Sequence, residues 1–502
     1  MTESAHSLRN PERSRMNDRL ALAGVACLFL GGAASFVDPD IFHCLSLARE
    51  SLAAGTLLEA DVHAYTPTVT PVVHHEWLHG MILHAILAWG GAALFLAWKH
   101  AIVLAIGVCA FLLARRRGAG PGTFAILAPA AILMAWTGIT SIRAQMYTLL
   151  FTAVLLHFLE DDRAGGKLWV FPWLLLHALW LNIHGGFVVG FGLVALHAVE
   201  QALRRRPVRH VLLGLAAAAA LIVANPYGFR YYAYLESAVF LDRSSIPEWE
   251  PLWRGFPPVL LIWSISLVVA AYGVARKGHR SFPGVLLLAA AAWAALRHQR
   301  HLSIYAVLWI SLVPSVIEGT PLAEMFRRFQ MRRAATALWA LFLGGALAVS
   351  ALFAKPWSLA VPAHPGDNDK ILYPSAALEY LKGSGFRGNV IVPFTLGAYV
   401  SWKLHPAVLV SIDGRYEAAY DPSLLEEHMT FYNARAGWKD LLDRYPSDLA
   451  LIPRNRLVAP LMRSESGWSL VYEDDAFEIY ARPGLELPRS SRRGERLVGT
   501  LP

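Results

Sequence analysis

Residues 92–117 read A-A-L-F-L-A-W-K-H-A-I-V-L-A-I-G-V-C-A-F-L-L-A-R-R-R, and this run decides the class of the protein. Its apolar part, 92–114, is long enough to cross about 30 Å of hydrocarbon as a helix. Arg115 to Arg117 follow directly, and basic residues collect in loops on the cytoplasmic side of a membrane. This one stretch therefore predicts both a transmembrane helix and its orientation.

The composition of the whole chain supports the same class. Of its 502 residues, 55% are hydrophobic and only 16% are charged, whereas soluble domains carry about 25% charged residues. Cys27, Cys44 and Cys109 are scattered and odd in number, so they predict neither a disulfide framework nor a thiolate metal site. A soluble enzyme, a disordered chain and a disulfide scaffold are therefore excluded.

Similar apolar runs occur on both sides of residues 92–117. Trp77 to Trp89 is also apolar but too short to cross, so we expect an interfacial or re-entrant helix there. The two shortest runs, 168–182 and 282–296, are the weakest of the predicted spans. The eleven spans are 19–36, 92–114, 121–138, 144–160, 168–182, 186–203, 210–225, 257–274, 282–296, 302–318 and 334–354.

Lysine and arginine divide unevenly between the two sides that these spans define. Most of the basic residues before residue 355 fall in the predicted cytoplasmic loops. This bias places the N-terminal segment, 1–18, in the cytoplasm of a bacterium and the C-terminal part outside its cytoplasmic membrane. The formal net charge of +8 is thus mostly a topology signal, and we expect membrane lipids and no nucleic acid as partners.

The composition changes after the last span. Prolines predict a linker at 355–366, and residues 367–485 alternate short β-rich and helical runs, which is typical of an α/β domain with a partly parallel sheet. We expect 486–502 to be disordered. The predicted fold class is an α-helical polytopic membrane protein, 19–354, with a C-terminal extracytoplasmic α/β domain. Strands are expected at 389–394, 407–412, 449–452, 469–472 and 477–481, and helices at 375–382, 396–404, 422–434 and 437–444.

Polar and ionisable side chains gather in the first outer loop, 37–91, and at the outer ends of later spans. Such groups are costly in hydrocarbon, so their repeated occurrence on one side predicts a shared polar cavity. A single residue of this kind is more often a cap or an anchor. The residues expected to line the cavity are His43, His75, Glu76, Gln145, Asn182, His184, Asn225, Glu248 and His301.

Two carboxylates and three arginines stand out within this set. Asp38 and Asp40 could supply a general base or hold a divalent cation such as Mg²⁺ or Mn²⁺. Alternatively, they cap a helix expected from about Ile41 to Ala54. Arginines at a membrane surface suit bidentate contact with phosphate, or they anchor helix ends. The arginines in question are Arg143, Arg297 and Arg300.

A zinc-protease pattern also occurs in the first outer loop. His75, Glu76 and His79 spell H-E-x-x-H, which on a helix binds zinc with the glutamate as base. Asn225-Pro226-Tyr227-Gly228 is similar to the N-P-D-G segment of intramembrane site-2 metalloproteases, but Tyr227 stands where the third ligand is needed. An intramembrane zinc metalloprotease is therefore the least favoured function for this chain.

Short motifs along nearly the whole chain resemble one superfamily. They are D-P-D-I-F-H from Asp38, Tyr65-Thr66-Pro67, His75-Glu76-Trp77-Leu78, Arg143-Ala144-Gln145, Asn182-Ile183-His184-Gly185-Gly186, Asn225-Pro226-Tyr227-Gly228, Arg300-His301, Gly397-Ala398-Tyr399 and Asp413-Gly414-Arg415. Together they resemble bacterial membrane proteins of the GT-C glycosyltransferase superfamily, near the dolichyl-phosphate-mannose-type and oligosaccharyltransferase-type enzymes.

The resemblance implies transfer of a hexose or pentose from a polyprenyl-phosphate-linked donor to a glycan, lipid or protein acceptor on the outer face. It implies that Asp40, with Asp38 as neighbour, acts as base or orients the acceptor. Arg143, Arg297 or Arg300 would neutralise the leaving phosphate. The chain has Asp40-Ile41 where the mannosyltransferases have an Asp-Glu pair, and it lacks the W-W-D-Y-G signature of the oligosaccharyltransferases.

Two points stay open from the sequence. Asp413 and Arg415 follow a predicted strand, where open α/β sheets bind ligands, so they either bind the acceptor or, as we favour, pair to hold the turn. A transporter or lipid-handling protein could use the same cavity without catalysis. Most ionisable groups lie at outer span ends, with Lys99 and His100 as the main exceptions, and this favours the enzyme.

Overall fold

The computed structural model describes residues 11–33, 37–240, 247–278, 282–352, 359–367, 371–464, 467–496 and 498–501. The chain forms two compact units, each assembled from separate segments. The first unit holds Met1–Phe36, Leu96–Ala224 and Asp242–Ser358. The second unit holds Val37–Phe95, Asn225–Leu241 and Leu359–Pro502. The predicted first outer loop thus folds with the C-terminal part of the chain.

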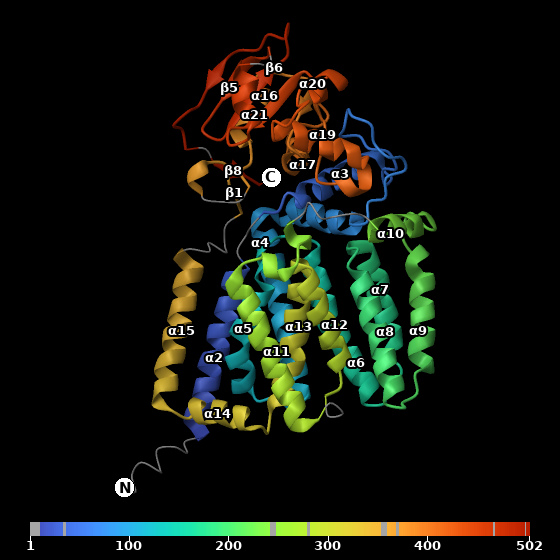
Figure 1. The fold of residues 1–502 in the computed structure, drawn as a ribbon, viewed down its shortest axis with the longest axis vertical. Coiled ribbons are helices and arrows are strands. Elements are labelled where there is room, and N and C mark those ends of the chain that lie inside the picture. Colours follow the sequence, from blue (N-terminus) through green and yellow to red (C-terminus); the bar gives the residue numbers. More distant parts are fainter. Residues whose placement is uncertain are drawn as a thin grey trace. The chain divides into compact units, whose positions relative to one another are not determined.

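The first unit consists mainly of helices that run side by side, with the short α14 lying across one end of them (Figure 1). Each predicted span coincides largely with a helix, although 34–36 and 353–354 lie outside the described residues. The helices are α2 (Pro11–Gly32), the second part of α4 (Trp77–Arg116), α5 (Pro121–Thr140), α6 (Gln145–Arg163), α7 (Val170–Ile183), α8 (Phe187–Leu203), α9 (Arg209–Ala220), α11 (Pro257–Lys277), α12 (Val285–Arg297), α13 (Leu302–Ile317), α14 (Pro321–Gln330) and α15 (Arg333–Leu352).

Five helices among the described residues are long and apolar enough to cross a membrane. Four shorter apolar helices, Val170–Ile183, Phe187–Leu203, Arg209–Val223 and Val285–Arg297, coincide with predicted spans but fall short of that length. The membrane-type helices are therefore confirmed, whereas the total of eleven spans and their orientation stay predictions. The five are Trp77–Arg116, Pro121–Thr140, Pro257–Lys277, Gln299–Ile317 and Arg333–Leu352.

Packing within the first unit follows from residue size and polarity. Almost every residue of α13 is buried, as its uniformly apolar sequence predicts for a central helix. Ala21, Ala125 and Ala335 pack together with Trp339 where α2, α5 and α15 meet. Small residues let helix backbones approach closely, and this substitutes for a hydrophobic driving force in lipid.

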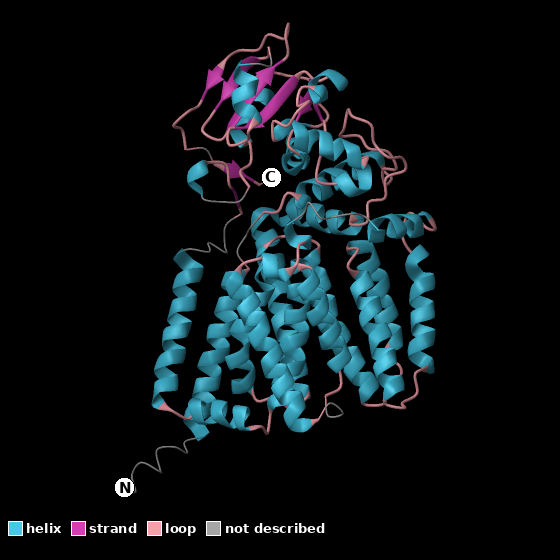
Figure 2. Ribbon diagram, viewed as in Figure 1, coloured by secondary structure: helices cyan, strands magenta, loops and turns pink. Residues whose placement is uncertain are grey.

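The second unit is built on a six-stranded sheet, and its strands appear in magenta in Figure 2. The strand order is β3-β2-β4-β6-β5-β7; β2 runs parallel to β3 and β4, while β6 runs antiparallel to β4 and β5. The partly parallel sheet predicted from the sequence is confirmed. Its strands are β2 (Gly388–Ile391), β3 (Val408–Val410), β4 (Leu449–Pro453), β5 (Ser469–Glu473), β6 (Phe477–Ala481) and β7 (Ser490–Ser491).

Helices surround this sheet close to their predicted positions. They are α16 (Ser375–Gly383), α17 (Phe394–Leu404), α18 (Tyr416–Ala419), α19 (Pro422–Tyr432), α20 (Asp440–Arg444) and α21 (Val458–Ser464). The 486–502 segment, which we expected to be disordered, contributes β7 and also β8 (Gly499–Thr500). β8 pairs with β1 (Ala360–Val361) from the expected linker. Backbone pairing orders these short pieces, and composition does not reveal it.

The first outer loop becomes part of the same sheet. The backbone N–H of Val410 donates to the carbonyl of His63 (2.9 Å), and the N–H of Tyr65 donates to the carbonyl of Val410 (3.2 Å). The Thr66 hydroxyl donates to the Ser411 carbonyl (2.6 Å). The loop thereby covers the edge of β3, where unpaired backbone groups would otherwise remain.

The rest of the second unit comes from three helices. The predicted helix after Asp38 is confirmed as α3 (Asp40–Ala54), and α10 spans Arg230–Phe240. The first part of α4 begins at Trp77, as expected for the short apolar segment, and its geometry breaks at Gly91 with φ 55° and ψ −151°. The break lies within the second unit, close to the division of α4 between Phe95 and Leu96.

Replacing Gly91 with alanine is expected to destabilise the chain by about 1–3 kcal/mol, because side chains other than hydrogen disfavour this backbone region. A Cβ at Gly91 meets no atom of the described residues within 4 Å, so the loss reports backbone conformation alone. Thermal unfolding of the purified chain, followed by tryptophan fluorescence, measures the change.

Gly192 in α8 provides the matched control, since a Cβ there also finds open space but the backbone is helical. Gly192→Ala is expected to stabilise the helix by up to about 1 kcal/mol. Equal stability of Gly91→Ala and the wild type would show that the break is not held by this glycine.

Candidate functional site

A buried ion triad lies at the centre of the second unit. Arg415, in the turn after β3, contacts Asp413 with Nη2–Oδ2 at 2.6 Å and Asp61 of the first loop with Nη2–Oδ2 at 2.5 Å. All three side chains are almost completely buried. Asp61 also accepts the backbone N–H groups of His63 (2.8 Å) and Ala64 (2.7 Å) through Oδ1. The triad therefore fixes the loop segment that pairs with β3.

Electrostatics within the triad follow from this geometry. Burial opposes ionisation of Asp413, but the charge and hydrogen bonds of Arg415 outweigh it and lower the pKa of Asp413 to about 2. Asp413 and Arg415 pair with each other, as in the turn-holding alternative, and the partner that sequence reasoning missed is Asp61. The ion pair places these two residues in the scaffold of the site.

The start of α3 lies next to this turn. Asp38 is buried and its Oδ1 accepts the backbone N–H of Asp40 (3.1 Å), the first residue of α3, although the N-cap position is Pro39. A Cβ on Gly414 would lie 3.3 Å from Asp40 Oδ1 and 4.0 Å from His43 Nδ1. The glycine between Asp413 and Arg415 thus leaves room for the Asp40 carboxylate.

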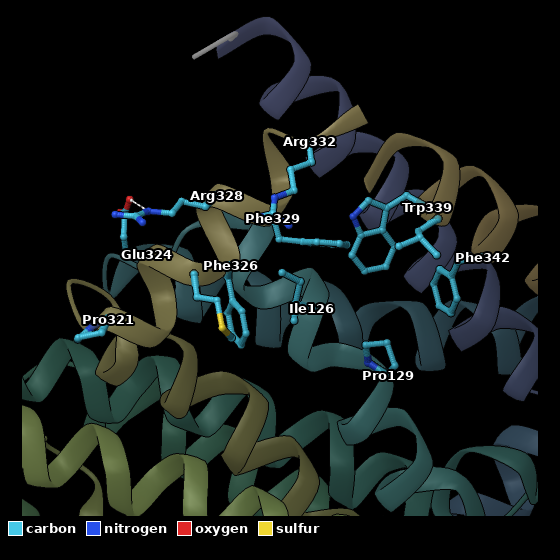
Figure 3. A pocket seen from close by; sticks show the side chains of 12 residues that line it. Ile126, Pro129, Pro321, Glu324, Phe326, Arg328, Phe329, Arg332, Trp339 and Phe342 are labelled. Atoms are coloured by element: carbon cyan, nitrogen blue, oxygen red, sulfur yellow. Dashed lines mark hydrogen bonds and ion pairs between the residues drawn. The ribbon is translucent and has the colours of Figure 1, made fainter. Parts of the chain in front are cut away.

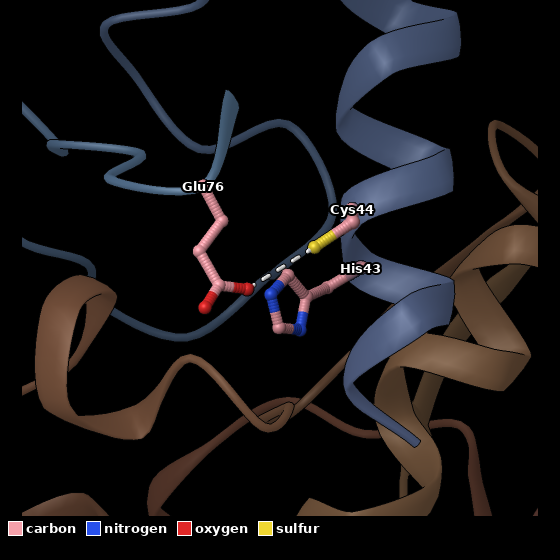
Figure 4. Close-up of side chains that lie close together, drawn as sticks. All are labelled: His43, Cys44 and Glu76. Atoms are coloured by element: carbon pink, nitrogen blue, oxygen red, sulfur yellow. Dashed lines mark hydrogen bonds between the residues drawn. The ribbon is translucent and has the colours of Figure 1, made fainter. Parts of the chain in front are cut away.

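Three side chains with metal-ligating atoms converge one turn further along α3. His43 and Cys44 from α3 approach Glu76 from the turn before α4 (Figure 4), and one ligand atom of each lies within 4.8 Å of the others. The Cys44 thiol donates to Glu76 Oε2 at 3.6 Å. Burial raises the pKa of this thiol, and the neighbouring Glu76 raises it further. A second such group combines Glu50, His63 and His405.

The H-E-x-x-H pattern does not form a protease-type site in the described structure. His75 and Glu76 lie in a turn, and α4 begins only at Trp77, so the two histidines do not share a helical face. The His75 ring stacks on Tyr234 with centroids 5.1 Å apart. Glu76 instead joins His43 and Cys44. The order of residues suggested a zinc site, but the helix starts too late to build it.

The carboxylates Asp38 and Asp40 were also candidates for holding Mg²⁺ or Mn²⁺. Within the described ranges, neither belongs to a group of three ligating side chains. One oxygen of Asp38 is already engaged by the helix backbone. A hard cation needs several oxygen ligands around one point, so a metal role for this pair stays a prediction.

The first unit contains its own cluster of predicted residues. Glu248 bridges two arginines, with Arg143 Nη1 at 2.9 Å from Oε2 and Arg300 Nη1 at 3.4 Å from Oε1. All three side chains are partly exposed. Arg300 also lies over the Trp249 ring at 4.6 Å, and Gln145 Nε2 donates to the Arg300 carbonyl at 3.3 Å. Two guanidinium groups are thus held beside one carboxylate.

The other predicted cavity residues mainly tie helix ends together. Asn182 donates to the carbonyls of Ala178 and Ala224, and His184 Nδ1 lies 2.7 Å from the Thr148 hydroxyl. Arg297 is the exposed last residue of α12. The predicted set divides between the units. The second unit holds Asp38, Asp40, His43, His75, Glu76, Asn225, Asp413 and Arg415, and the first holds Arg143, Gln145, Asn182, His184, Glu248, Arg297, Arg300 and His301.

A hollow of about 870 Å³ lies elsewhere in the first unit (Figure 3). Residues of α5, α14 and α15 line it, including Phe329 and Trp339, with Arg328 and Glu324 paired at its edge. None of the predicted site residues lines this hollow. Its aromatic lining and its different set of lining residues separate it from the candidate site.

Comparison with solved structures finds a similar fold. The fold is similar to the crystal structure of the oligosaccharyltransferase of Archaeoglobus fulgidus in its apo form, with a TM-score of 0.50 and 11% sequence identity. The match covers 93% of this chain and 74% of the archaeal one. No protein-family model matches the sequence, and no curated protein matches it. The similarity therefore shows a shared fold.

Removing the cation of the triad is expected to destabilise the chain strongly. Arg415→Met leaves Asp61 and Asp413 buried without a cation, which costs about 3–5 kcal/mol. Arg435→Met is the matched control, because its ion pair with Glu426 (2.7 Å) is more than half exposed and contributes at most about 1 kcal/mol. Unfolding of the purified full-length chain in denaturant measures both, and equal losses would contradict a structural triad.

Acid is expected to destabilise the second unit through buried imidazoles near Arg415. Burial, followed by the charge of Arg415, lowers the pKa of His74 to about 3, whereas an unfolded histidine titrates near 6.5. The unfolded chain therefore binds more protons between these values, and stability present above pH 6.5 is lost as the pH falls toward 3. At pH 4.5 this histidine alone contributes a loss of about 3 kcal/mol.

Unfolding midpoints at pH 7 and pH 4.5 test this expectation. His74→Asn should reduce the difference between the two midpoints. His364→Asn, at a less buried histidine of the same unit, should leave it unchanged. An undiminished acid loss in His74→Asn would assign the effect to other groups.

Proposed function

We propose that this chain is a membrane glycosyltransferase. It transfers a sugar from a polyprenyl-phosphate-linked donor to an acceptor on the outer face of the membrane. The observation that carries the proposal is the fold, which extends over 93% of the chain and is similar to that of an archaeal oligosaccharyltransferase. Among the described residues, five helices are long and apolar enough to cross a membrane, which suits a lipid-linked donor.

Asp40 is the residue we propose as base. It lies at the first turn of α3, partly exposed, in the space that Gly414 leaves open. The carboxylate takes the proton from an acceptor hydroxyl or amide while the acceptor oxygen or nitrogen bonds to the anomeric carbon of the sugar. The bond between that carbon and the donor phosphate breaks, and its electron pair leaves with the phosphate.

Arg143 and Arg300 are the residues we propose for the leaving phosphate. A phosphate released from the sugar gains negative charge, and fixed guanidinium groups stabilise such charge without reorganising. Glu248 orients both arginines by holding one on each of its oxygens. The two guanidinium groups supply the positive charge that an anionic lipid phosphate would meet.

Two substitutions test these roles in purified protein supplied with a labelled polyprenyl-phosphate sugar. Asp40→Asn is expected to reduce turnover by about 10²–10⁴-fold, the usual contribution of a general base. Arg300→Gln is expected to weaken donor binding and slow turnover, because one phosphate contact is lost. Transferred or released sugar is the readout, and binding of the donor is measured separately.

Asp421→Asn is the matched control, since this exposed carboxylate caps α19 through the N–H of Ser423 (2.9 Å) and has no proposed part in catalysis or donor binding. It should keep full activity. Full activity in Asp40→Asn would remove the proposed base. Movement of an intact labelled donor across a vesicle membrane, with no sugar cleaved, would favour a transporter or lipid-handling protein instead.

A further inference from the structure

We propose that His43, Cys44 and Glu76 form a zinc-binding site in the second unit. The site lies one turn of α3 beyond the proposed base Asp40, but it does not depend on the proposed glycosyl transfer. One nitrogen, one sulfur and one oxygen ligand come from two segments of the chain, α3 and the turn before α4. Figure 4 shows the three side chains pointing toward one another.

The geometry is close to that of a bound metal. All three ligand atoms lie within 4.8 Å of one another, and Cys44 Sγ is 3.6 Å from Glu76 Oε2. Zinc binds sulfur at about 2.3 Å and nitrogen or oxygen at about 2.0–2.2 Å, so the ligands of one ion lie about 3.5 Å apart. Rotation of the Glu76 side chain, which stands on a turn, can close the remaining distance.

The donor set selects the kind of metal. Thiolate and imidazole ligands favour zinc and its neighbours over Mg²⁺ or Ca²⁺, which bind almost only oxygen. When zinc binds, the Cys44 sulfur exchanges its proton for the metal, and the proton passes to solvent. Three protein ligands leave the fourth tetrahedral position for water or another small ligand.

Burial and scaffold also suit a metal site. Cys44 is 5% exposed, whereas His43 and Glu76 are partly exposed and provide a path for the ion. The ligating segments are held firmly, because a Cβ on Gly80 of α4 would lie only 2.4 Å from the Cys44 carbonyl oxygen. Such close backbone packing keeps the ligands in place before the metal arrives.

The second ligating group provides a contrast. Glu50 lies 3.2 Å from His405 Nδ1, but its carboxylate also pairs with the Arg49 guanidinium (2.8 Å), a cation that competes with a metal. We assign the metal to the group that contains the thiol, and His63 serves as a specificity control.

The test uses full-length protein in detergent, stripped with a chelator and then loaded with Zn²⁺ or Co²⁺. We expect about one zinc per chain by elemental analysis, and Co²⁺ should show a thiolate-to-cobalt charge-transfer band in the near ultraviolet. Cys44→Ser should lose this band and lower zinc affinity at least tenfold, since even outer-shell partners of metal ligands contribute about 10–100-fold.

Cys27→Ser and Cys109→Ser are matched controls, because these free cysteines lie in the first unit. Both should bind zinc as the wild type does. Glu76→Gln removes a second ligand without touching α3, so it tests the site even if Cys44→Ser folds poorly. A wild type without zinc, a cobalt band that survives Cys44→Ser, or zinc lost with His63→Ala instead would each overturn the proposal.

Discussion

The buried ion triad of Asp61, Arg415 and Asp413 is the interaction on which the second unit depends. A buried charge without a partner is strongly unfavourable, so the three side chains hold their positions only together. Asp61 belongs to the first loop and Arg415 to the turn after β3, although more than 350 residues separate them in sequence. Their contact fixes the pairing of residues 63–65 with Val410 and brings the turn at Gly414 to Asp40.

Features encoded by local periodicity could be predicted from the sequence. Apolar runs of helical length predicted a helix at each span. Alternating short runs predicted β2 to β6, with bounds that differ from the observed ones by at most three residues. The assembly of the second unit could not be predicted in this way. Its three segments carry no shared pattern, and their association depends on charges and backbone groups far apart in the chain. Short strands such as β7 and β8 depend on partners in the same manner.

The candidate site shows the same limit. Sorting residues by membrane side selected Arg143, Arg300 and Glu248, which the structure brings together in one ion-pair cluster. Cys44 was set aside because the three cysteines are scattered, yet its neighbours in space are a histidine and a glutamate. The sequence contains two local hints of these groupings. Asp61 is followed two residues later by His63, and His43 is followed directly by Cys44. Arg117, read as a topology signal, also forms an ion pair with Glu160 at 2.6 Å.

The three-residue turn Asp413-Gly414-Arg415 both stabilises the scaffold and determines the position of the proposed base. Its charged residues anchor the turn, and its glycine provides the space that Asp40 occupies. A surface ion pair would not fix the turn in this way, since exposed pairs contribute about 0–1 kcal/mol and allow the side chains to move. A proposed base must be held within about 0.5 Å of its working position. A buried triad with two members flanking Gly414 meets that demand, so the turn that follows β3 sets where Asp40 can act.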